Sequence, residues 1–283
     1  MIAWKQHLAG YEWLIHQVWY LEAEPGEVIE PKPHLIPNPR AHLLLTPQQQ
    51  PYAYDSGETL LSGKGSHLLA ASEHLLLLDD NPPIKRIGIT FRPEGLFILQ
   101  HAINVVQPVS AINQCQWFDW LTPLFNAEFQ QGLWQQNTKE SLVDYLQSHF
   151  ASLSLSLPQS NSFIAVQKAV HEMDKQTAMT PDTMLDVEAL ASQCACSRRT
   201  LERSFKQVVG LSVKQYQQMA RLEQMILALY QQQSAVDWTH FSQQFGFSDQ
   251  SHLIRTLKQQ LRKTPGNYMK RRDLTIDIYG DFE

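Results

Sequence analysis

The hydrophobic pattern of the chain changes its period near residue 115. Before that point, short apolar or alternating runs are separated by turns rich in proline and glycine, such as EPGEVIEPKPHLIPNPR (24–40) and SGETLLSGKGSH (56–67). The runs are LIHQVWYL (14–21), AHLLLT (41–46), SHLLAA (66–71), EHLLLL (73–78) and IKRIGITF (84–91). Short strands at this spacing predict an antiparallel β-sandwich or barrel.

From Trp117 onward the apolar positions follow the helical period. In SLVDYLQSHF (141–150) the apolar side chains fall on one helical face. The stretch ASLSLSLPQS (151–160) is the best boundary, and Asn161 is the expected cap of the next helix. The sequence therefore predicts an α+β chain. Its parts are a β-rich domain with C-terminal helices (1–155), an all-α domain (161–272) and an acidic tail (273–283).

Within the all-α part, one segment is repeated. LASQCACSRRTLERSFKQVVGLSVKQY (190–216) aligns with FSQQFGFSDQSHLIRTLKQQLRKTPGNY (241–268). Each copy predicts a short helix, a turn at a small residue (Ala195 or Gly246), and a second helix capped by Ser197, or by Ser248 or Asp249. This plan is that of a helix-turn-helix, in which the second helix enters the DNA major groove. The two motifs are expected at about 186–208 and 236–260.

The segment between the copies predicts a linker helix. Met219, Leu222, Ile226 and Leu229 form a continuous apolar stripe. About 18 helical residues span roughly 27 Å, which is on the order of one turn of DNA, ~34 Å. Two recognition helices on this linker helix would reach successive major grooves without dimer symmetry.

Charge is distributed unevenly along the chain, and this changes the interpretation. Residues 184–272 hold 13 Lys/Arg against 6 Asp/Glu, whereas residues 1–183 hold 10 against 18, and residues 273–283 hold four acids and no base. A basic block between acidic ones indicates that only this region meets a polyanion.

Residues 184–270 resemble the DNA-binding domain of the AraC/XylS family of transcriptional regulators. The resemblance is carried by the first repeat, by RLEQMILAL (221–229), and by FGFSDQSHLIRTLKQ (245–259) followed by TPGNY. Ala195, Leu257, Arg262 and Trp238 depart from the family pattern, which indicates a divergent member. The N-terminal region is similar, more weakly, to a β-rich domain that precedes this module in uncharacterised regulators.

Taking Leu201 and Phe205 as buried turns Arg198, Arg199, Glu202 and Arg203 outward. The resemblance assigns base contacts to Arg199, Glu202 and Arg203. On the second helix the outward set is Gln250, Ser251, His252 and Arg255, and we expect Lys206 and Lys258 to contact phosphates. Arg203 and Arg255 have an open alternative, a structural ion pair with a neighbouring helix.

The β-rich domain is expected to bind a small-molecule effector, with Trp19, Tyr52, Tyr54 and Arg92 as candidate pocket residues. For each of them, ordinary packing in the core is the competing interpretation. The domain could instead serve for homodimerisation, or could be a metal-binding cupin-like or other enzymatic module. The histidines and glutamates lack a compact metal-ligand spacing, and phosphate-loop or nucleophile-elbow motifs are missing. We therefore expect no catalytic residue, metal or cofactor.

Partners and location complete the expectations. Double-stranded DNA is the main partner, and the family resemblance implies RNA polymerase. The longest leucine run (75–78) is far below the ~20 residues of a membrane span. The start, MIAWKQHLAG, lacks a signal-peptide pattern, and three cysteines fit a reducing compartment. We therefore expect a cytoplasmic protein. Cys194 and Cys196 flank the first turn, where packing is favoured over metal or redox chemistry.

Overall fold

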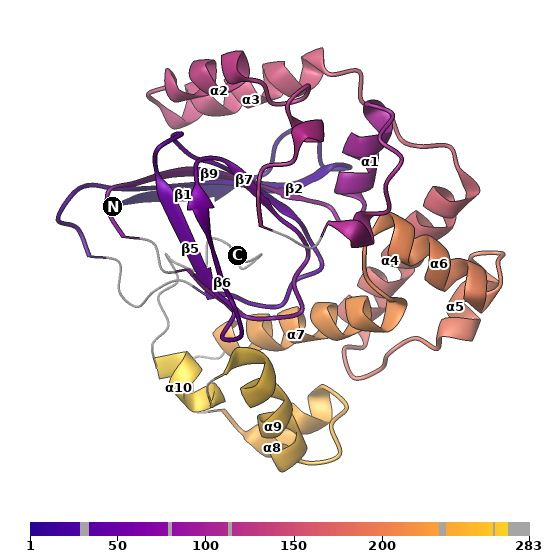
Figure 1. The fold of residues 1–283 in the computed structure, drawn as a ribbon. Helices are drawn as coiled ribbons and strands as arrows, with labels where there is room; N and C mark the ends of the chain where they lie inside the picture. Colours follow the sequence, from indigo (N-terminus) through magenta and orange to yellow (C-terminus); the bar gives the residue numbers. More distant parts are fainter. Residues whose placement is uncertain (29–33, 79–80, 113–114, 232–235, 263, 271–283) are drawn as a thin grey trace.

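The computed structural model describes residues 1–283 except 29–33, 79–80, 113–114, 232–235, 263 and 271–283. It is an α+β protein in which an N-terminal antiparallel β-sandwich is followed by helices (Figure 1). The predicted fold class is thus confirmed. The predicted acidic tail lies outside the described residues.

Two antiparallel sheets form the sandwich. The five-stranded sheet has the order β1-β2-β9-β4-β7, and the four-stranded sheet has the order β3-β8-β5-β6. The strands are β1 (Ile2–Gln6), β2 (Ile15–Ala23), β3 (His34–Leu35), β4 (His42–Leu45), β5 (Pro51–Asp55), β6 (Leu60–Lys64), β7 (His67–Leu69), β8 (Leu76–Leu78) and β9 (Ile84–Phe91).

Side chains alternate along the central strands, so the large sheet contributes to two hydrophobic cores, one on each of its faces. On β2, Trp19 and Leu21 face the second sheet, whereas Val18 and Tyr20 face the helices. On β4, Leu44 joins the inner core, which lies between the two sheets, whereas Leu43 and Leu45 join the outer core, which lies between the large sheet and the helices. Both faces of the large sheet are therefore buried, which explains why apolar residues occupy consecutive positions in β2 (18–21) and β4 (43–45).

Three helices pack beside the large sheet: α1 (Gly95–Ala102), α2 (Ala127–Trp134) and α3 (Lys139–Ser152) (Figure 1). Short 3₁₀ turns, η1 (Val109–Ala111) and η2 (Asp119–Leu121), lie between them. Thr138 caps α3 in a capping box with Ser141. The helix after the Ser-rich stretch, α4 (Asn161–Met179), is capped by Ser160 and not by Asn161, whose prediction as the cap was wrong by one residue.

The remaining helices are α5 (Val187–Gln193), α6 (Arg198–Val208), α7 (Val213–Gln231), α8 (Trp238–Gln244), α9 (Gln250–Leu261) and α10 (Pro265–Lys270). One hydrophobic core runs from the large sheet through α4 and α6 into the start of α7. The rings of Phe97 on α1 and Phe163 on α4 stack across it at 6.0 Å. The second helix-turn-helix packs instead on the later part of α7, and among the described residues of the sandwich Ile36 and Leu75 alone join that core.

Candidate nucleic-acid interface

The first helix-turn-helix comprises α5 and α6. Asp186 caps α5 by accepting from the backbone N–H groups of Glu188 and Ala189, and Ser197 caps α6 by accepting from Thr200. Between the helices Ala195 adopts a left-handed conformation, with φ of 54°. Glycine adopts this conformation at lower cost. The turn that the sequence predicted at Ala195 is therefore built with a small backbone strain.

The second helix-turn-helix repeats this construction with α8 and α9. Asp237 caps α8, and Asp249, one of the two predicted candidates, caps α9 by accepting from the His252 N–H at 2.8 Å. Gly246 makes the turn with φ of 63°. A Cβ on this residue would lie 2.2 Å from the backbone oxygen of Asp182, so the turn is packed against the loop that precedes α5.

The linker helix α7 joins the two motifs, which lie at its opposite ends (Figure 1). Its 19 residues span roughly 28 Å. The guanidinium of Arg221 lies 4.3 Å from the ring centroid of Phe247 in the second turn, and Gln217 donates to the carbonyl of Leu185 at 3.2 Å. These contacts, together with Gly246 on Asp182, fix the direction of the second motif relative to the first.

The outward face of α6 carries most of the predicted contacts. Arg198, Arg199, Arg203 and Lys206 are exposed. Arg198 forms a salt bridge with Glu188 at 3.4 Å, and both side chains are more than half exposed, so this pair adds little stability. Arg199, Arg203 and Lys206 form no salt bridge with any described carboxylate. The alternative that Arg203 is a structural ion pair has no support among the described residues.

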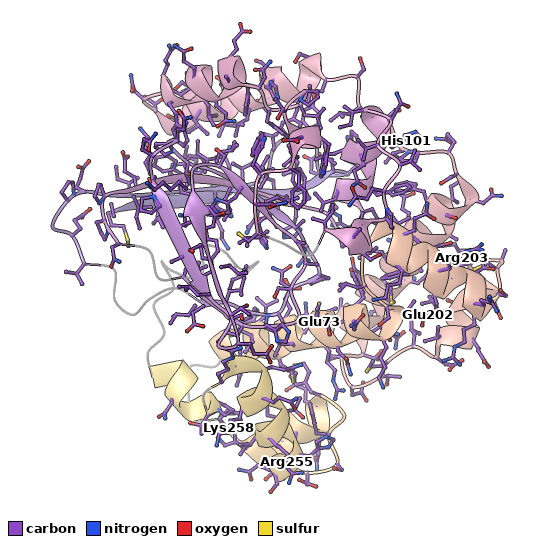
Figure 2. All side chains as sticks on the ribbon, viewed as in Figure 1. Glu73, His101, Glu202, Arg203, Arg255 and Lys258 are labelled. Carbon is purple, nitrogen blue, oxygen red and sulfur yellow. The ribbon has the colours of Figure 1, made fainter. Side chains whose placement is uncertain are left out.

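Glu202 differs from its neighbours on α6. It is only partly exposed, and its carboxylate accepts from the backbone N–H of Val213, the first residue of α7, at 3.4 Å. Figure 2 shows Glu202 on the inner side of α6 relative to Arg203. The sequence had suggested only an outward, base-reading position for this residue.

On α9 all the predicted residues are exposed: Gln250, Ser251, His252, Arg255 and Lys258. The His252 ring packs edge-on against Phe247 at 5.2 Å, and its Nδ1 lies 3.3 Å from the Ser248 hydroxyl. Arg255 and Lys258 form no described salt bridge and extend from the lower side of the molecule in Figure 2.

The electrostatics of α6 oppose its own stability. Arg198 and Arg199 occupy the first turn, which holds no acidic residue. Cations at a helix N-terminus meet the positive end of the helix dipole and cost about 0.3–1 kcal/mol each. A phosphate near the same N-terminus would reverse the sign of this interaction.

The sandwich holds α7 through charged contacts. The guanidinium of Arg40 binds both carboxylate oxygens of Glu223 at 3.1 Å, with each side chain only 13% exposed. Tyr216 of α7 donates to Asp174 of α4 at 2.6 Å, and Arg92 lies 3.8 Å from the same carboxylate. Beside them Glu94 is buried, and burial raises the pKa of its carboxyl to about 7.

The four candidate effector residues are not brought together. Trp19, Tyr52 and Tyr54 fill the inner core of the sandwich, whereas Arg92 lies at the junction with α4. His67, which was not among the candidate pocket residues, stacks on Tyr52 with ring centroids 3.6 Å apart, and its Nε2 lies 2.7 Å from the Tyr54 hydroxyl. Burial lowers the pKa of His67 to about 3, so the ring is neutral.

Two cavities lie between the sandwich and α6, on either side of η1. Val109 of η1 is buried against Gly210, whose added Cβ would lie 3.2 Å from it. One cavity, of about 520 Å³, is lined by α1, the loop after it and α6, and the other, of about 480 Å³, faces the four-stranded sheet. Lys206 lines both. The sequence carried no signal for this contact, because it joins segments about 100 residues apart.

No group of three or more His, Cys, Asp or Glu side chains among the described residues could hold a metal ion. Cys194 is buried and Cys196 partly buried, neither forms a disulfide, and burial raises the pKa of Cys194. Within the described part of the chain, no helix has the length and apolar character needed to cross a membrane.

Comparisons with known proteins agree with the helix-turn-helix geometry. Residues 190–271 match the family model described as a helix-turn-helix domain. No curated protein matched this sequence. A transcriptional regulator from Chromobacterium violaceum with an AraC-type DNA-binding domain is 25% identical, covering 39% of this chain and 93% of that one, with a TM-score of 0.34. ToxT from Vibrio cholerae is 9% identical over 96% of this chain and 99% of that one, with a TM-score of 0.48. Residues 190–271 of this chain form an AraC-type helix-turn-helix domain.

Proposed function

We propose that this chain is a sequence-specific DNA-binding regulator of transcription in which α6 and α9 enter successive major grooves. One observation carries the proposal. Two helix-turn-helix motifs lie at opposite ends of one linker helix, and each presents exposed cations without a described carboxylate partner on its second helix. Unpaired cations on two separated helices suit a polyanion that extends over about the length of α7.

Within this interface we assign different roles to different side chains. Arg199, Arg203 and Arg255 are suited to guanine O6 and N7, and Gln250 to adenine. Lys206 and Lys258 contact phosphates, which position the protein without reading sequence. Arg198, Ser251 and His252 complete the contact surface. Glu202 contributes by holding the start of α7 in addition to any contact with cytosine.

The N-terminal and C-terminal parts of the chain have different roles in this proposal. We propose that residues 161–272 are the DNA-binding domain and that residues 1–155 form a domain that modulates it without catalysing a reaction. The modulating event is the binding of a small molecule or pairing with a second copy. The shared core of the sandwich, α4 and α6 supports this, since a change in the sandwich reaches the first recognition helix through direct packing.

The proposal is tested by selecting binding sites from a pool of random-sequence duplexes and measuring affinity by fluorescence anisotropy. Arg199→Ala and Arg255→Ala should each cost about 1–3 kcal/mol at the selected site and relax the preference at one base position. Lys258→Ala should weaken binding to all sequences alike and lower the salt dependence by about one charge. Lys139→Ala removes an exposed cation on α3, away from both motifs, and should leave the affinity for DNA and its salt dependence unchanged.

Two results would count against the proposal. The first is a pool that yields no enriched sequence while salt alone governs the affinity, which would indicate non-specific binding. The second is an equal loss of affinity in Arg255→Ala and Lys139→Ala, which would show that net charge rather than the recognition helix determines binding.

A further inference from the structure

The C-terminal end of α9 carries a residue that is unusual at its position. Arg262 follows the last helical residue and adopts a left-handed backbone, with φ of 54°. Glycine is the usual residue at such a helix end, because a Cβ makes the left-handed conformation costly. An arginine at this position retains that cost, which a contact of its side chain can offset.

The guanidinium of Arg262 lies against the sandwich. The turn between β5 and β6 points toward α9 in Figure 1, and a Cβ added to Gly57 in this turn would lie 1.7 Å from Nη1 of Arg262. Gly57 has φ of 76°, and its N–H donates to the Asp55 carboxylate at 2.5 Å. Ile36 and Leu75 of the sandwich share a hydrophobic core with α9. The sandwich therefore contacts the second recognition helix directly.

The second helix-turn-helix is thereby attached at two separate points. At its turn, Gly246 packs on the backbone oxygen of Asp182, and Phe247 packs on Arg221 of α7. At the other end of α9, Arg262 rests on the turn between β5 and β6. The 12 residues of α9 place these points about 18 Å apart. Two points at this separation oppose a rotation of α9 that one point alone would allow.

We propose that Arg262 is a positioning residue through which the sandwich sets the spacing of the two half-sites that the chain accepts. The inference rests on the proposed function, in which α6 and α9 enter successive major grooves. One base pair inserted between the half-sites moves the second groove by about 3.4 Å and turns it by about 34°.

The geometry of α9 explains why this contact is sensitive to spacing. If the N-terminus of α9 stays in the displaced groove, the helix turns by about 34°. Its C-terminus then moves by about 10 Å, since the helix is about 18 Å long. A displacement of that size separates Arg262 from Gly57. The contact is kept at one spacing and lost at the others, so it contributes a preference for that spacing.

The test measures the affinity of the full chain for three duplexes by fluorescence anisotropy. These are the selected site and two versions with one base pair inserted or removed between its halves. Gly57→Ala places a methyl group on the guanidinium and displaces it, at little cost because it is the far end of a flexible side chain. The ratio of affinities between the selected and altered spacings should fall about threefold, since one exposed contact of a charged side chain contributes little free energy.

A second variant removes the same contact from the other side. Arg262→Gly deletes the guanidinium and suits the left-handed backbone, so it should lower the spacing preference as Gly57→Ala does, without loss of stability. The double variant should fall no further than either single variant, because both substitutions remove one contact.

Gly26→Ala is the matched control. Gly26 has φ of 91° and no atom within 4 Å of an added Cβ, so the substitution strains the sandwich backbone without displacing a side chain. It should keep the spacing preference of the unsubstituted chain. An equal fall in Gly26→Ala and Gly57→Ala would attribute the effect to general destabilisation and overturn the proposal.

The remaining outcomes are equally decisive. The proposal fails if Gly57→Ala or Arg262→Gly keeps the full spacing preference, or if their effects add in the double variant. An equal loss of affinity for all three duplexes in Arg262→Gly would show a phosphate contact in place of positioning. A chain that selects a two-part site yet tolerates all three spacings overturns this inference alone. A chain that selects no sequence overturns the proposed function and this inference with it.

Discussion

The turn of the second helix-turn-helix offers the most direct test of how the two motifs are held together. Gly246 combines a left-handed backbone with a close approach to the backbone oxygen of Asp182, which lies before the first motif. Gly246→Ala adds one methyl group, which makes the left-handed backbone costly and also creates a clash with the Asp182 backbone oxygen. The backbone conformation costs about 1–2 kcal/mol for a residue with a Cβ. The methyl, 2.2 Å from a carbonyl oxygen, forces a shift that costs about 1–3 kcal/mol more.

Two matched variants separate these terms. Gly10 has φ of 83° and no atom within 4 Å of an added Cβ, so Gly10→Ala reports the backbone term alone, about 1–2 kcal/mol. Ala195, at the equivalent turn of the first motif, already bears the methyl with φ of 54°. Ala195→Gly should therefore stabilise the chain by about 0.5–1 kcal/mol.

The assay is urea unfolding followed by circular dichroism, with affinity for the selected DNA measured in parallel. We expect Gly246→Ala to lose about 2–5 kcal/mol of unfolding free energy and, where folded, to bind DNA more weakly, because the shift turns α9 relative to α6. The reasoning is refuted if Gly246→Ala costs no more than Gly10→Ala. A destabilised Ala195→Gly would contradict the account of the first turn.

Two further predictions concern the junction between sandwich and helices, and a third concerns the turn of the first helix-turn-helix. Arg40→Met and Glu223→Met should each destabilise the chain, because each removes one half of a buried salt bridge. The double variant should lose about 1–3 kcal/mol less unfolding free energy than the sum of the two single losses. Additive losses would refute the pairing. Because burial raises the pKa of Glu94 to about 7, its contribution to stability is present below the unfolded value near 4.5 and is lost as pH rises through 7. Glu94→Gln should gain about 3 kcal/mol over the unsubstituted chain at alkaline pH and nothing under acidic conditions, and a gain independent of pH would contradict this. Burial keeps the Cys194 thiol protonated, so peroxide should leave DNA affinity unchanged; a loss abolished by Cys194→Ala with Cys196→Ala would restore the redox hypothesis.

The sequence predicted the parts of the fold that have a strong local period. The runs that became β2 and β9 and the two helix-turn-helix repeats were identified because each repeats a simple pattern within about 30 residues. The strand β6 was hidden in a segment predicted as turns (56–67), since Gly57, Gly63 and Gly65 interrupt it, and β5 lies outside all the predicted runs. The helix α1 was missed because its first five residues (95–99) are apolar without a break and resemble a buried strand.

The candidate site was predictable where it depends on one helix and not where it depends on tertiary contact. Exposure of Arg199 and Arg255 follows from their spacing relative to buried leucines. The turn of Glu202 toward Val213, and the cavity beside Arg203, depend on how α7 and the loop after α1 pack. Trp19 and Tyr54 show the same limit, because an aromatic residue in a strand has the same pattern whether it lines a pocket or fills a core.

The central claim, that two recognition helices on one linker read one face of the duplex, is tested by hydroxyl-radical footprinting on the selected site. The account predicts two protected patches on one face, about one helical turn apart. Arg199→Ala should weaken protection in one patch and Arg255→Ala in the other. A single patch, or an inverted repeat in which both substitutions weaken both halves equally, would contradict the claim.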